Sequence, residues 1–159
     1  MPILTMKLTK FNFAACIALA SATVFAQTVD VKNPWVRPTV PGQKGTGGFA
    51  TFTSKDGAQL VGLSAAVAGV SEVHEMKVDA SGTMRMSAMP ALDLPAGQAV
   101  ELKPGGMHLM LMDLKTALPK DTTIAVVLQF KAKDGKAFQQ TVSFTVSARP
   151  PAAMNEHKH

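Results

Sequence analysis

Apolar and polar residues alternate along most of the chain, which is the pattern of strands that bury one face. Val29 and Val31 are separated by polar residues, and Gly48 to Thr53 is rich in aromatic and β-branched residues, which favour strands. The segments that we expect to be strands begin at about residue 28 and continue with 48–53, 60–67, 70–76, 82–86, 98–102, 107–113, 122–130 and 137–146.

Turn residues separate these segments at regular intervals. Lys55-Asp56-Gly57 and Lys133-Asp134-Gly135-Lys136 indicate turns, because Asp-Gly tolerates the positive φ angles of tight hairpins. Asp79 to Gly82 indicates a further turn, and Pro90 to Gly97 indicates a loop. About eight or nine short strands with little helical periodicity predict an all-β sandwich, formed as a single domain by residues 27–149.

The first 26 residues differ from this pattern and have the features of a secretory signal peptide. Lys7 and Lys10 form a basic start, Phe11 to Leu19 is apolar, and Val24-Phe25-Ala26 offers small residues for a cleavage site. Translation from Met1 or from Met6 fits this arrangement. A buried helix or a membrane anchor is the alternative, but the apolar run is short for a membrane span. We therefore expect a periplasmic protein, cleaved near Ala26, without stable membrane insertion.

The single cysteine, Cys16, lies inside the apolar run. A lipoprotein signal places its cysteine at the end of such a run, so we do not expect a lipid anchor. Without residues 1–26 the chain has no cysteine, which excludes disulfides, Cys-x-x-Cys redox pairs and thiolate-ligated metal sites. The same absence argues against an electron-transfer cupredoxin, whose copper needs a cysteine ligand.

Charge and residue types exclude two further classes of function. The chain has 16 Lys and Arg against 11 Asp and Glu, and removing Lys7 and Lys10 leaves 14 against 11. A net charge near +3 that is scattered along the chain does not indicate nucleic-acid binding. The domain has two histidines, no nucleophile-elbow glycine motif and no obvious carboxylate pair, so we do not expect an enzyme. We expect a monomer.

Seven of the ten methionines and two of the four histidines fall between residues 74 and 112. Side chains at positions i and i+2 of a strand share a face, so His74 lies with Met76, and His108 with Met110 and Met112. Met84 and Met86 share a face on a third strand. Thioethers and neutral imidazoles suit a soft metal, above all Cu(I).

Methionine also fills cores, which leaves a metal-free structural sandwich open as an alternative. The methionines that could serve packing alone are Met76, Met84, Met89, Met107 and Met112.

The spacing of these residues resembles the H(M)x10Mx21HxM signature of the PCu(A)C family of periplasmic copper chaperones. One residue follows His74, ten more precede Met86, and twenty-one separate Met86 from His108-Leu109-Met110. The second position of the signature is often methionine and is Glu75 here. Trp35-Val36-Arg37 and the segment 102–106 also look like that family, and the resemblance covers about Val29 to Val146.

This resemblance implies a cupredoxin-like β-sandwich that binds one Cu(I) through His74, Met86, His108 and Met110. It also implies delivery of copper to an acceptor such as the CuA centre in subunit II of cytochrome c oxidase, or to a Sco-type thiol protein. A periplasmic copper buffer or resistance protein would use the same site, and the sequence does not separate these roles.

Some members of that family carry Met- and His-rich C-terminal tails that hold a second copper, commonly Cu(II). Residues 150–159 resemble such a tail, although this one is short. The residues that would form the second site are Met154, His157 and His159, with Glu156 beside them. An ordinary solvated tail with two histidines is the alternative.

Overall fold

The computed structural model describes residues 28–151, and every regular element in that range is a β-strand. No helix in these residues is long and apolar enough to cross a membrane. Because the regular elements of this range are all strands, the all-β prediction is confirmed. The ten strands are β1 (Val29–Val36), β2 (Gly45–Ser54), β3 (Ala58–Ala65), β4 (Ala68–Val78), β5 (Met84–Met89), β6 (Leu92–Leu94), β7 (Ala99–Leu102), β8 (His108–Leu114), β9 (Thr123–Ala132) and β10 (Ala137–Val146).

The strands hydrogen-bond in the order β5-β4-β8-β2-β1-β10-β9-β3-β6, and β7 pairs with β2 beyond the end of β8. All these pairings are antiparallel except that of β1 with β10. The inner faces of β2, β9 and β10 meet in one core, where Phe52, Phe130 and Phe144 have no exposed surface. This arrangement matches the predicted cupredoxin-like β-sandwich.

The strand count exceeds the predicted eight or nine because Pro90 to Gly97 is not wholly a loop. Leu92 and Leu94 are buried while Asp93 between them is exposed, so β6 follows the alternating pattern of a strand. It pairs with residues 58–60 of β3. Three residues between two prolines give too short a pattern for the alternation to stand out from the turn signals.

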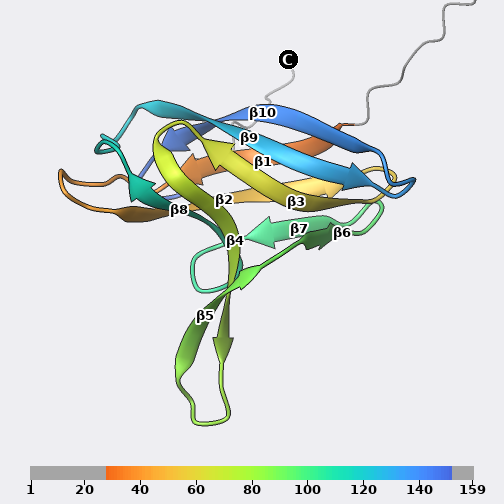
Figure 1. The fold of residues 1–159 in the computed structure, drawn as a ribbon, viewed down its shortest axis with the longest axis horizontal. Helices are drawn as coiled ribbons and strands as arrows, with labels where there is room; N and C mark the ends of the chain where they lie inside the picture. Colours follow the sequence, from red (N-terminus) through yellow and green to blue (C-terminus); the bar gives the residue numbers. More distant parts are fainter. Residues whose placement is uncertain (1–27, 152–159) are drawn as a thin grey trace, which may run out of the picture.

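The hairpin of β4 and β5 extends away from the body of the sandwich (Figure 1). Both strands are longer than predicted. β4 extends past the expected 70–76 at both ends, and β5 begins later than expected, at Met84, after the turn that contains Gly82 at φ 81°. From His74 to Ala88 no residue is buried. This hairpin and the adjacent β8 carry the histidines and methionines of the predicted metal site.

Candidate metal centre

Strand register places the four predicted ligands on one face of the sheet. His74 of β4 lies opposite His108 of β8, and Met86 of β5 lies opposite Met76 of β4. Met110 follows His108 on the same face of β8, opposite Gly47 of β2. Directly opposite residues on paired strands point to the same side, so the side chains from three strands converge outside the core.

The residues between these ligands point the other way, as the alternation predicts. Val73, Leu109 and Leu111 are buried in the core. Met89 and Met107 are partly buried and pack against that core, so for these two the packing interpretation holds. The alternation in this part of the sheet therefore places the predicted metal ligands on one face and core side chains on the other.

The two imidazoles are sheltered, whereas one thioether is open to solvent. His108 is 6% exposed and Met86 is 49% exposed. The ring centroids of His74 and His108 are 6.0 Å apart, with 57° between the ring planes. The histidines of the predicted site are therefore shielded from solvent, whereas Met86 is accessible to it.

A hollow of about 210 Å³ opens beside the rings. Three predicted ligands, Met86, His108 and Met110, line it. His74 does not line the hollow, and its ring lies beside that of His108. Met76, which the sequence left open, is part of the lining, whereas Met112 is not. The side chains that line the hollow come from Arg37, Phe49, Met76, Met86, Pro104, His108 and Met110.

The turn before β8 fixes the orientation of His108. The amide of Gly106 donates to the carbonyl of Lys103, and Gly105 has a φ of 82°, which suits glycine. The carbonyl of Gly106 then lies 3.0 Å from Nδ1 of His108. A carbonyl only accepts hydrogen bonds, so in the neutral imidazole Nδ1 carries the proton and Nε2 keeps a free lone pair.

The ring of His74 is held by a different contact. Its Nε2 lies 2.8 Å from a carboxylate oxygen of Glu72, two residues earlier on the same face of β4. Its Nδ1 is buried and has no hydrogen-bond partner among residues 28–151. An unpaired buried nitrogen beside a second imidazole is what a soft-metal ligand needs.

Glycine and aromatic residues of β2 form the floor of the hollow. A Cβ atom on Gly45 would come within 3.2 Å of the terminal methyl of Met110, and one on Gly47 within 3.2 Å of the ring of Phe49. The two glycines therefore leave room for these side chains. The ring of Phe49 lies 6.5 Å from that of His108, and the guanidinium of Arg37 lies 5.4 Å from the Phe49 centroid.

Asp79 organises the tip of the β4–β5 hairpin. Its carboxylate accepts hydrogen bonds from the hydroxyl and amide of Ser81, from the amide of Thr83 and from the guanidinium of Arg85. These contacts, the Ser81 hydroxyl first, lower the pKa of Asp79 to about 2. The tip is thus tied by one ionised side chain rather than by apolar packing.

The sequence did not identify Glu72, Phe49 or Arg37 as parts of this region. Glu72 could have been found, because it stands two residues before His74 on the same strand face. Phe49 lies in β2 and Arg37 directly follows β1, and only the tertiary pairing brings them to β8.

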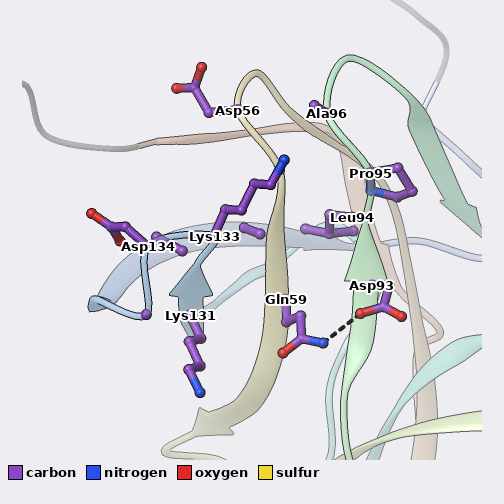
Figure 2. Close-up of a pocket in the computed structure, with 13 residues that line it drawn as sticks. Asp56, Gln59, Asp93, Leu94, Pro95, Ala96, Lys131, Lys133 and Asp134 are labelled. Atoms are coloured by element: carbon purple, nitrogen blue, oxygen red, sulfur yellow. Dashed lines mark hydrogen bonds between the residues drawn. The ribbon is translucent and has the colours of Figure 1, made fainter.

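A wider hollow of about 820 Å³ lies where β3 and β6 meet the turn between β9 and β10 (Figure 2). Asp56, Asp93, Asp134 and Lys133 are among its lining residues, and the Gln59 amide donates to Asp93 at 2.6 Å. Neither imidazole nor thioether lines it, so it lacks the soft donors of the site beside β8.

The second predicted copper site cannot be placed, because Met154, His157 and His159 lie outside the described residues. The same holds for residues 1–26, including Cys16 and the expected cleavage near Ala26.

Residues 29–146, from the start of β1 to the end of β10, match the family described as "Putative lipoprotein LpqE-like". The chain belongs to the LpqE-like family. A relative from Leifsonia xyli subsp. xyli, named "Putative lipoprotein Lxx21020", is 31% identical to this LpqE-like chain over 105 residues, which are 66% of this chain. The match covers 63% of that relative, so the chain spans less than two thirds of its length.

Solved structures with the same fold include the copper-bound PCuAC domain from PmoF2. It is 21% identical, with a TM-score of 0.61, over 79% of this chain and 97% of that domain. The apo form of DR1885 from Deinococcus radiodurans is 28% identical, with a TM-score of 0.56, over 94% and 95% of the two chains. Its Cu(I) form is 27% identical, with a TM-score of 0.53, over 82% and 87%. The resemblance to the PCu(A)C family is confirmed.

Proposed function

We propose that this protein is a Cu(I) carrier whose ion is held by His74, Met86, His108 and Met110. The observation that carries the proposal is the convergence of these four side chains on one sheet face, with a ring nitrogen free on each histidine. Relatives described as copper-bound or as a Cu(I) form support the choice of metal.

The donor set favours Cu(I) and its release. Thioethers are neutral and soft, so they favour Cu(I) over Cu(II) and bind it less firmly than thiolates do. With two thioethers and two imidazoles the ligand set carries no negative charge. An acceptor that offers thiolates can therefore draw the ion away.

Met86 supports transfer rather than permanent storage. It is 49% exposed and stands on the projecting hairpin, where another protein can approach it. We propose that the protein acts after export to the periplasm as a monomeric carrier and not as a catalyst. The proposed acceptor is the CuA centre in subunit II of cytochrome c oxidase, or a Sco-type thiol protein.

Competition for Cu(I) against a chromophoric chelator tests the site. Residues 27–159 should bind one Cu(I), and Met86→Leu should weaken binding by more than about tenfold, because even changes around metal ligands cost about 10–100-fold. His108→Ala should weaken binding in the same way. Met89→Leu is the matched control, since Met89 lies on the opposite face of β5 and packs on the core.

Two outcomes would count against the site. Either the unaltered chain takes up no Cu(I), or Met86→Leu and Met89→Leu bind with equal affinity. Transfer to a purified CuA domain, measured as the copper content of the acceptor after the two proteins are separated, then distinguishes a delivery protein from a copper buffer. Deleting residues 151–159 and repeating the titration with Cu(II) tests the proposed second site in the tail.

A further inference from the structure

The two imidazoles of the proposed site are neighbours, with ring centroids 6.0 Å apart, but they are anchored through different nitrogens. The carbonyl of Gly106 holds Nδ1 of His108 at 3.0 Å, whereas the carboxylate of Glu72 holds Nε2 of His74 at 2.8 Å. A neutral imidazole carries one N–H donor and one lone pair, and both anchoring groups accept hydrogen bonds. The partners therefore select opposite tautomers for the two rings.

The burial of one ring nitrogen of His74 gives this difference a consequence. Its side chain is 12% exposed, and Nδ1 finds no hydrogen-bond partner among residues 28–151. A second N–H on this ring would leave a buried donor at Nδ1 without an acceptor, which is unfavourable. With the neutral ring, Nδ1 holds a lone pair that a bound cation would satisfy.

We propose that Glu72 is a positioning residue that fixes His74 as its Nε2–H tautomer and so presents Nδ1 to copper, while His108 presents Nε2. This inference rests on the proposed function. Metal-bound histidines commonly donate their other N–H to a carboxylate or a carbonyl, and one of each is found here. Glu72 itself does not contact the ion.

The neighbouring carboxylate of Glu75 does not make an equivalent contact with His74. Glu75 is adjacent in sequence, but its side chain lies on the opposite face of β4 and pairs with Lys77 at 2.8 Å. Glu72 is thus the carboxylate that the strand alternation directs to the face of His74. A matched pair of variants at positions 72 and 75 separates the positioning role from a general effect of negative charge.

Long-range 1H–15N correlation spectra of uniformly labelled residues 27–159 test the inference directly. Without metal, His74 should give the Nε2–H pattern and His108 the Nδ1–H pattern. On addition of Cu(I) under reducing, oxygen-free conditions, the 15N resonances that move most should be Nδ1 of His74 and Nε2 of His108.

Variants at Glu72 supply the second readout. Glu72→Ala should lower Cu(I) affinity by about 10–100-fold and populate both tautomers of His74. Glu72→Gln keeps an acceptor oxygen and should restore the Nε2–H tautomer with most of the affinity. Glu75→Ala should match the unaltered protein in both measurements.

The outcomes distinguish this inference from the proposed function. If Cu(I) moves Nε2 of His74, or if Glu72→Ala leaves both tautomer and affinity unchanged, the positioning role is wrong while the copper site stands. If Cu(I) moves no nitrogen of either histidine, the copper site itself is wrong and the inference falls with it. If His74 shows the Nδ1–H pattern in the metal-free protein, the assignment of Glu72 fails independently of copper.

Discussion

The hairpins β4–β5 and β9–β10 share one topology, but the side chains on their alternating faces differ. In each turn an aspartate accepts a hydrogen bond from a backbone amide, and a glycine, Gly82 or Gly135, has a positive φ. In β9–β10 alternate residues such as Val126 and Leu128 have no exposed surface. In β4–β5 no residue from His74 to Ala88 is buried, and alternate residues carry imidazole and thioether instead.

The difference teaches that a period of two does not by itself indicate a core. It indicates that the two faces of a strand have different tasks. In β9–β10 one face excludes water and supplies stability. In the outer part of β4–β5 one face gathers donors, and the ladder and the polar tip hold the strands together. Loss of stability and loss of binding should therefore separate between the two hairpins.

The largest expected difference is in the free energy of unfolding. Phe130→Ala removes a fully buried ring from β9 and should lower it by about 3–5 kcal/mol. Val78→Ala at the end of β4, where Val78 is 65% exposed, should change it by less than about 0.5 kcal/mol. Urea unfolding followed by fluorescence of Trp35 measures both. Similar losses in the two variants would remove the contrast.

Amide hydrogen exchange should show the next largest contrast. The outer hairpin can open without exposing the core, so ladder amides in residues 76–86 should exchange at least about 100-fold faster than those of β9. Cu(I) should slow exchange in the hairpin and leave β9 unchanged, because the ion would join β5 to β4 and β8. Equal protection of both hairpins without metal would contradict the comparison.

A smaller effect should distinguish two methionines of the same sheet face. Met76 lines the hollow, whereas Met112 does not. Met76→Leu should weaken Cu(I) binding by about tenfold, the lower end of the cost for groups around a metal, and Met112→Leu should leave it unchanged. The chelator competition used for Met86→Leu measures both. A larger loss with Met112→Leu would show that the hollow does not mark the ion's surroundings.

The smallest effect concerns the hairpin tip and its pH dependence. The folded-state pKa of Asp79 is lowered from 3.8 to about 2, so its tethering is fully present above pH 3.8 and is lost as the pH falls through about 2. The amide resonances of Ser81 and Thr83 should shift in that window, and those of β9 should not. Asp79→Asn should remove the transition, and a midpoint near 3.8 in the unaltered protein would contradict the tethering.

The sequence predicted most of the fold because local pattern and tertiary burial agree. The bounds of β10 were predicted without error, since Asp134-Gly135 marks the turn and Ala137 to Val146 alternates throughout. β6 was missed, because its pairing with β3 is set by the closure of the sheet and not by its three residues.

The face of the candidate site was predictable for a related reason. Once β4 and β8 are strands, alternation alone places Val73 and Leu109 inside and His74 and His108 outside. The contact between Glu72 and His74 was not predictable at the same level, since it depends on the conformation of both side chains. The place of Phe49 beside His108 depends on a pairing between strands that are distant in sequence.

Because His74 of β4 pairs with His108 of β8, the formation of the site depends on the register between these two strands. Because side chains alternate with a period of two, a slip of β8 along β4 by one residue would turn His108 and Met110 toward the core and Leu109 toward water. Such a mispaired chain would lose metal uptake and apolar burial together. Retention of a soft metal would therefore report, in a single measurement, that β4 and β8 have found their native alignment.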